Sequence, residues 1–255
     1  MSKKLKRARL QTADNLAAHE VDGQPVHNSI LSSLPPQERD AILSKAKFVN
    51  LPTHTLLNEI AAPILQGYFM NSGLASILNV MSDGKSVEVG LTGTEGFVGL
   101  PLTVGYGTSP TRALMQIQGS AFRIAAKQLV ELLPTCPTLE RRLNRYAQEL
   151  NLQGTQIAAC NKLHPVEQRL ARWLLMSQDR VGSSTFVLTQ EFLSHMLGTR
   201  RASVTIAAGT LQKAGLITYK RGRVKIEKRS KLEKASCECY QALRDQMKSW
   251  SRNPA

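Results

Sequence analysis

The chain has 255 residues, of which 42% are hydrophobic, as expected for a globular protein with one large domain or two ordinary ones. Its net charge of +14 is concentrated at one end: residues 162–255 hold 18 Lys and Arg against 7 Asp and Glu, whereas residues 31–161 hold 10 against 9. No apolar run approaches the ~18 residues of a membrane helix, and no apolar stretch typical of a secretory signal follows the basic N-terminal segment. The composition thus excludes a transmembrane helix and indicates a polyanionic partner for the C-terminal region.

The first half of the chain predicts a basic tail followed by a β-rich domain. Residues 1–29 predict a disordered tail, and a helix is expected to begin at Ser33, whose hydroxyl would cap it ahead of two prolines. Between Phe48 and Ile124, short segments such as 86–91 alternate apolar and polar residues and are separated by glycine-rich turns. This texture predicts an antiparallel roll or barrel, and we place a β-roll sensor-like domain at residues 30–134.

A long helix is predicted over residues 135–163. Its apolar side recurs at alternating spacings of four and three, in the row Leu139, Leu143, Tyr146, Leu150, Gln153, Ile157 and Cys160. Such a row either packs on its own domain or pairs with a second copy of the chain. We favour pairing, because a two-fold DNA site needs a dimer, and we assign dimerisation to Leu139, Leu143, Tyr146, Leu150, Gln153 and Ile157.

A hinge is expected at Pro165, since proline disfavours helical geometry at the residue before it and suits the first position of a new helix. The next helix is predicted over Val166–Ser177, with Leu170 and Trp173 facing inward. Beyond the hinge we place a winged helix-turn-helix domain at residues 164–236 and a C-terminal helix or tail at 237–255.

The most informative stretch is Leu188–Ile226. It predicts a short helix, a tight turn at Gly198, a second helix that opens on Arg200 and Arg201, and a basic β-hairpin. The spacing within the second helix directs one apolar side inward: Val204, Ala207, Ala208 and Leu211. A helix, a turn and a second helix with cationic and small residues at its start present side chains to the DNA major groove.

Two kinds of DNA contact are expected from this stretch. The base-reading residues are Arg201, which can donate two hydrogen bonds to guanine, and Ala202, Thr205 and Ile206, whose methyl groups suit thymine. The phosphate-contacting residues are Thr189, Gln190, Arg200 and Ser203 on the helices and Lys220, Arg221, Arg223 and Lys225 on the hairpin.

The order of these parts resembles the CRP/FNR family of bacterial transcription regulators from about Leu31 to Ser236. The similar motifs are LGTRRASV at 197–204, LQKAGLI at 211–217, and EGFVG at 95–99, which resembles the approach to the family's cyclic-nucleotide phosphate cassette. The resemblance implies an α+β fold with an antiparallel β-roll, a long dimerisation helix and a C-terminal winged helix-turn-helix. It also implies a homodimer on a roughly palindromic double-stranded DNA operator, with half-sites ~10 bp apart, and RNA polymerase as a partner.

The chain departs from this family at both sites. Ala202 and Ile206 stand where relatives often carry Glu and Arg, so a different operator is expected. The candidate effector pocket comprises Gly99, Leu100 and Arg112, but cyclic-nucleotide binders have a Glu at the place of Leu100 and a Ser or Thr after the arginine. We therefore expect that cyclic-nucleotide binding has been lost. The alternative is a receptor whose DNA binding is gated by a cyclic nucleotide or another small molecule.

The cysteines predict no cofactor. Cys136, Cys160, Cys237 and Cys239 form no CxxC pair and have no histidine at zinc-finger spacing, and no cysteine precedes Cys136 to hold an iron–sulfur cluster. His54 and Cys160 are isolated as haem ligands. Cys237 and Cys239 stand too close for an unstrained internal disulfide, so we expect a reduced pair on a C-terminal helix in a reducing, cytoplasmic compartment. The sequence carries no catalytic motif, and an enzyme is not predicted.

Overall fold

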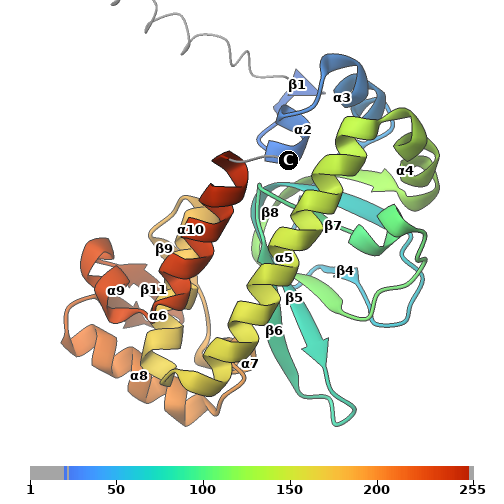
Figure 1. Cartoon of the computed structure of the whole chain (residues 1–255). Coiled ribbons are helices and arrows are strands. Elements are labelled where there is room, and N and C mark those ends of the chain that lie inside the picture. Colours follow the sequence, from blue (N-terminus) through green and yellow to red (C-terminus); the bar gives the residue numbers. More distant parts are fainter. Residues whose placement is uncertain (1–19, 22, 253–255) are drawn as a thin grey trace, which may run out of the picture.

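The structure is a computed structural model that describes residues 20–21 and 23–252 as a β-roll and a smaller helical domain, joined by one long helix (Figure 1). The predicted basic tail lies outside the described residues over 1–19. The fold begins before residue 30, however, because β1 (Glu20–Val21) pairs with β2 (Gln24–Pro25). Within the described residues, no helix combines the length and apolarity that crossing a membrane requires.

Asn28 ties this N-terminal segment to the roll. Its fully buried side chain donates to the carbonyls of Met70 and Gly96 at 2.8 and 2.9 Å, and it accepts from the Leu31 backbone at 3.1 Å. The last bond caps α2 (Ser29–Ser32), a helix that the sequence analysis did not anticipate. The predicted disorder is therefore wrong for residues 23–29, because a buried asparagine anchors them to the sheet.

The roll is built on one antiparallel sheet in the order β3-β8-β5-β6, with β4 paired to β8 and β7 paired to β5. Its strands are β3 (Lys47–Leu51), β4 (Leu56–Asn58), β5 (Gln66–Val80), β6 (Ser86–Thr92), β7 (Phe97–Val98) and β8 (Arg112–Ala125). Large apolar side chains such as Phe69, Phe97 and Phe122 are buried between its layers. The predicted antiparallel roll is confirmed.

Short helices close the roll: α3 (Pro36–Leu43), η1 (Leu100–Val104), α4 (Ala126–Leu132) and η2 (Leu133–Thr135). The predicted cap of α3 is wrong. Ser33 lies at the end of α2, where its hydroxyl donates to the Ile30 carbonyl at 2.8 Å, and α3 begins at Pro36 without a side-chain cap.

The long helix α5 (Pro137–Leu163) lies along its own β-roll (Figure 1). The predicted row faces that roll from Leu139 to Gln153, whereas its last member, Cys160, packs against Cys237 and Cys239. Leu139 and Leu143 are fully buried in the roll's core, and the Tyr146 hydroxyl donates to the Thr92 hydroxyl at 2.8 Å. Gln153, the polar member, accepts from the Leu91 backbone at 2.7 Å.

These contacts correct the assignment of the row to dimerisation. The row Leu139, Leu143, Tyr146, Leu150, Gln153 and Ile157 is buried or half-buried within one chain. The spacing alone did not show whether the row packs on its own roll or on a second copy of the chain. It packs on the roll because glycines there let the helix approach closely. At Gly90, an added Cβ would come within 2.7 Å of the Leu150 side chain.

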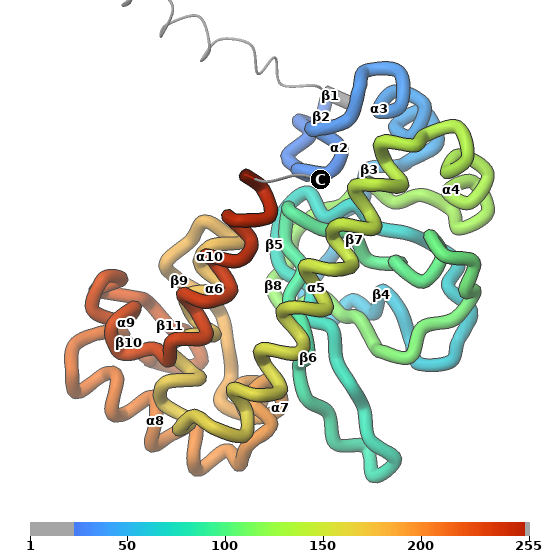
Figure 2. The backbone as a smooth tube through the Cα atoms, in the orientation of Figure 1, coloured from blue at the N-terminus to red at the C-terminus, as the bar shows by residue number. Residues whose placement is uncertain are grey.

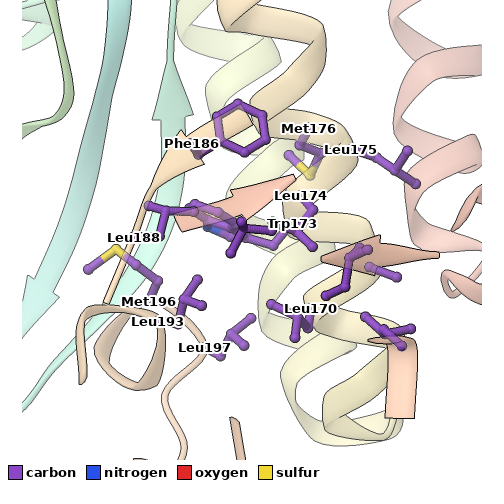
Figure 3. Close-up of a cluster of buried hydrophobic side chains, with 14 of the residues drawn as sticks. Leu170, Trp173, Leu174, Leu175, Met176, Phe186, Leu188, Leu193, Met196 and Leu197 are labelled. Carbon is purple, nitrogen blue, oxygen red and sulfur yellow. The ribbon is translucent and has the colours of Figure 1, made fainter. Parts of the chain in front are cut away.

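The C-terminal domain consists of α6 (Val166–Val181), β9 (Thr185–Val187), α7 (Gln190–Met196), α8 (Arg201–Lys213), β10 (Ile217–Lys220), β11 (Arg223–Ile226), α9 (Arg229–Ala235) and α10 (Cys239–Arg252). Trp173 of α6 lies at the centre of its core, among Phe186, Leu188 and Leu193 (Figure 3). The predicted helix break at Pro165 is confirmed, since α5 ends at Leu163 and α6 begins directly after Pro165.

The C-terminal domain packs against the β5–β6 hairpin of the roll, and α10 returns alongside α5 and α6 (Figure 2). Leu74, Leu78 and Leu91 of the roll belong to the same apolar cluster as Trp173. Glu88 of β6 accepts a hydrogen bond from the Trp173 indole at 2.8 Å. The roll and the C-terminal domain are thus joined by a shared core as well as by the segment around Pro165.

Candidate nucleic-acid interface

The turn between α7 and α8 is fixed by local chemistry. The Thr189 hydroxyl caps α7 by accepting from the Phe192 backbone at 3.1 Å. Gly198 follows the helix end with φ of 55°, a left-handed geometry that favours glycine. An added Cβ there would also lie 2.9 Å from Val87 in the roll. Gly198 therefore permits both the turn and the contact between the two domains.

Helix α8 presents its first turns to solvent. Val204, Ala207, Ala208 and Leu211 are buried against α6 and α7, as the spacing predicted. On the other side Arg201 and Ala202 are exposed, and 72% of the Ile206 side chain is accessible. The arrangement gives a cationic and apolar tip of the kind that enters a major groove.

Thr205 and Gln190 are less free than the sequence suggested. The Thr205 hydroxyl lies 2.9 Å from the Gln190 side-chain oxygen, to which it donates, and 3.1 Å from the Arg201 carbonyl. This bond joins α8 to the start of α7. It leaves the Thr205 methyl group and the Gln190 amide nitrogen for an external partner. Ser203 is half-buried, whereas Arg200 is exposed.

The hairpin forms a three-stranded wing in the order β10-β11-β9. Arg221 and Gly222 make its turn with φ of 50° and 72°, a pair of positive values typical of tight hairpins. Lys220, Arg221 and Arg223 are exposed and form no ion pair with a described residue. Lys225 differs, because its ammonium group lies 2.9 Å from the Glu227 carboxylate. Three cations of the wing are thus available to phosphate, and the fourth is held by its neighbour.

Among the candidate effector residues, Arg112 is already paired with a carboxylate of the chain and does not form an open anion site. Arg112 binds Glu59 of the β4 end, with Nε 3.0 Å from both carboxylate oxygens and a terminal nitrogen at 2.9 Å. The hydrogen bond from Arg112 lowers the pKa of Glu59. Gly99 has φ of 122° and starts η1 with Leu100. Arg112 therefore has a partner within the chain, as expected for a structural cation.

A second constellation was missed from the sequence. Cys160, His164, Cys237 and Cys239 converge so that their sulfur and imidazole atoms lie within 4.8 Å of one another. Cys160 and His164 stand four residues apart around the end of α5, and this C-x3-H spacing was the sequence signal available. Its partners lie more than 70 positions later in the chain, where no local pattern could place them. The predicted pairing of Cys237 and Cys239 on one helix is also incomplete, because α10 begins at Cys239.

The fold and the exposed helix define a winged helix-turn-helix protein with an N-terminal β-roll domain. Residues 168–235 match the model of the Crp-like helix-turn-helix domain. None of the curated proteins compared matches the sequence.

Among solved structures, the chain is similar to the c-di-GMP-responsive global regulator CLP of Xanthomonas campestris, FixK2 of Bradyrhizobium japonicum and a CRP-family transcriptional regulator of Thermus thermophilus. Their TM-scores are 0.63, 0.64 and 0.60 at identities of 19%, 15% and 17%. The alignments cover 75%, 75% and 74% of this chain and 99%, 98% and 96% of theirs. The chain therefore has the fold of CRP/FNR transcription regulators and carries a Crp-like helix-turn-helix domain, which confirms the resemblance found in the sequence.

Proposed function

We propose that this protein is a sequence-specific regulator of transcription that binds double-stranded DNA through α8 and the wing. The observation that carries the proposal is the exposed tip of α8, where Arg201, Ala202 and Ile206 project from a helix whose opposite side is buried. The match of residues 168–235 to a Crp-like helix-turn-helix domain supports it.

In the proposed complex, the N-terminal end of α8 enters the major groove. Arg201 donates two hydrogen bonds to a guanine, worth about 1–3 kcal/mol of discrimination against other bases. Ile206 and the methyl groups of Ala202 and Thr205 contact thymine. Phosphate contacts come from Thr189, Gln190, Arg200 and Ser203 around the helices and from Lys220, Arg221, Arg223 and Lys225 along the wing. The family resemblance adds RNA polymerase as a partner.

We propose a homodimer on a two-fold operator, with a dimer surface different from the row predicted first. The buried row of α5 faces the roll, so the opposite face of the helix is the one open to a second copy. The exposed residues along that face are Arg141, Asn144, Gln148, Asn151, Thr155 and Ala158. Their spacing of three and four residues keeps them in one stripe along the helix.

The roll is proposed to have lost cyclic-nucleotide binding, because Arg112 is paired with Glu59 and Leu100 replaces the carboxylate that would hold the ribose. A second candidate function is a response to a different small molecule. It is favoured by an open cavity of about 590 Å³ between η1 and α5, lined largely by apolar side chains such as Pro101, Val104 and Tyr106. A ligand there would touch Asn144 of the proposed dimer face and so could couple to DNA binding.

Selection of bound sequences from random DNA tests the proposal directly, since a homodimer should recover a two-fold symmetric motif. On the selected site, Arg201→Ala should lower affinity about 5- to 150-fold, the equivalent of one lost bidentate contact, while affinity for unrelated DNA changes little. Lys45→Ala removes an exposed cation far from α8 and serves as the control. An equal loss on all sequences would show that Arg201 contacts phosphate, and no enriched motif would remove sequence-specific binding.

The dimer surface has its own test. Thr155→Arg adds a positive charge to the proposed dimer face of each copy and should shift the mass in solution to that of a monomer. Thr53→Arg, at an exposed turn of the roll, is the matched control and should stay dimeric. A wild-type protein that is monomeric with and without its selected DNA would rule out the homodimer.

A further inference from the structure

We propose that Cys160, His164, Cys237 and Cys239 bind one zinc ion per chain and thereby fasten the hinge end of α5 to the start of α10. This site is independent of the proposed DNA contacts. It departs from the expectation, drawn from spacing along the sequence, that the chain has no metal site. Three sulfurs and one imidazole are a donor set that tetrahedral zinc takes in structural sites.

The distances suit a single ion. The Cys160 and Cys237 sulfurs are 3.4 Å apart, and the Cys239 sulfur lies 3.5 Å from Nδ1 of His164. A tetrahedral ion with bonds of about 2.3 Å to sulfur and about 2.0 Å to nitrogen needs ligand atoms roughly 3.5–3.8 Å apart. Cysteines around an iron–sulfur cluster must reach past several iron and sulfide ions and stand farther apart. The observed spacing therefore favours one metal ion over a cluster.

The surrounding hydrogen bonds are those of a metal site. The far ring nitrogen of His164, Nε2, lies 3.0 Å from the Glu238 carboxylate, which orients the ring so that Nδ1 faces the sulfurs. A carboxylate behind a histidine in this way fixes its tautomer and strengthens it as a ligand. Gln156 donates to the Cys239 sulfur at 3.0 Å, a bond that a thiolate accepts better than a thiol.

Two buried arginines of α6 provide positive charge that a negatively charged metal site would balance. Arg169 and Arg172 of α6 are 6% and 3% exposed, and neither forms an ion pair with a described residue. The Nε atoms of both are buried without a hydrogen-bond partner in the described part of the chain. Buried cations need a compensating anion. Zinc with three thiolates carries a net negative charge, and it would supply that anion beside them.

The positive charge of Arg172 acts on Cys160 and also on the buried Glu88 in the domain contact. The metal site and the contact between the domains therefore share one electrostatic neighbourhood.

The position of the site gives it a structural consequence. Cys160 and His164 flank the last turn of α5 directly before Pro165, whereas Cys237 lies between α9 and α10 and Cys239 is the first residue of α10. A metal that joins them closes a loop of the chain that contains α6 to α9. Only 16% of the His164 side chain is accessible, so the ion would be reached from one open side.

Metal analysis of the full-length protein, purified with reductant and zinc and then dialysed, tests the proposal. We expect one zinc per chain in the wild type and a loss of zinc in Cys239→Ser. Cys136→Ser is the matched control, because Cys136 is a buried cysteine outside the cluster, and it should retain the ion. Glu238→Ala should bind zinc about tenfold or more weakly, since it removes the hydrogen bond behind His164.

Cobalt provides a readout that does not depend on any variant folding. Titrating Co²⁺ into metal-free, reduced wild type should give the intense visible bands of a tetrahedral site and a thiolate charge-transfer band, both abolished by added zinc. Chelation should lower the Tm of the wild type reversibly and leave that of Cys239→Ser unchanged. A weak octahedral cobalt spectrum, a Cys160–Cys237 disulfide in the zinc-treated protein, or the absorbance of an iron–sulfur cluster would each overturn the proposal.

Discussion

Glu88 makes the contact between the roll and the C-terminal domain sensitive to pH. Its carboxylate is fully buried on β6, accepts from the Trp173 indole at 2.8 Å and from the Ser76 hydroxyl at 2.7 Å, and lies in the fields of Arg172 and Arg180. Burial raises its pKa from 4.5 to about 7, and the two hydrogen bonds and the two arginines only partly offset that effect. The folded protein therefore holds a proton on Glu88 more tightly than the unfolded chain does.

The sign of the effect follows from this difference. A carboxyl group whose pKa is raised on folding contributes its full stability below the unfolded value of 4.5 and loses it as the pH rises through about 7. A shift of this size corresponds to about 3 kcal/mol of unfolding free energy, because each pKa unit is worth about 1.4 kcal/mol. Most of that loss, about 2–3 kcal/mol, should fall between pH 5 and pH 8.

Glu88→Gln isolates this contribution, because the amide keeps the shape and can still accept from Trp173 but does not titrate. Urea unfolding of the wild type and the variant at pH 5, 6, 7 and 8 gives the free-energy difference at each pH. Other titrating groups are common to both proteins and cancel. The wild type should lose about 2–3 kcal/mol relative to the variant across this range. A difference that stays constant with pH would refute the assignment of a raised pKa to Glu88.

Three further substitutions probe the packing that places α5 and the N-terminal segment. Gly96→Ala should lower the unfolding free energy by about 1–3 kcal/mol in urea titrations, because a methyl group there would overlap the Tyr146 phenol; Gly107→Ala, which meets open space, is the control. Asn28→Ala should cost about 2–4 kcal/mol by removing a cap and leaving buried carbonyls unpaired, and a loss under 1 kcal/mol would contradict that account. Leu143→Asp should lower the unfolding free energy by about 4 kcal/mol or more and so unfold the chain, which circular dichroism would detect. A folded monomer would instead indicate that the row forms the dimer contact.

The helix-turn-helix and its wing could be predicted from sequence because their signals are local. The inward side of α8 follows from spacings of three and four residues, and the turn needs a glycine at Gly198 because its φ is positive. The hairpin turn at Arg221 and Gly222 has the same basis. Each of these features depends on neighbours within a few positions, and such neighbours are visible in the chain itself.

The partner of the α5 row was decided only by the tertiary structure. A row of seven residues at helical spacing shows which side of a helix is apolar but not what covers it. The roll covers that side from Leu139 to Gln153, with a close approach at Gly90, and the segment around Cys237 and Cys239 covers Cys160. The pairing of Arg112 with Glu59, 53 positions apart, was invisible for the same reason.

The cysteine–histidine cluster shows the same division most clearly. The sequence by itself determined the residue types and placed Cys160 and His164 one helical turn apart. It took the return of α10 alongside α5 to bring Cys237 and Cys239 to them, 77 positions after Cys160 in the case of Cys237. The physical reason is that local propensity acts over a few residues, whereas a site assembled from distant segments exists only once the hydrophobic core has folded them together.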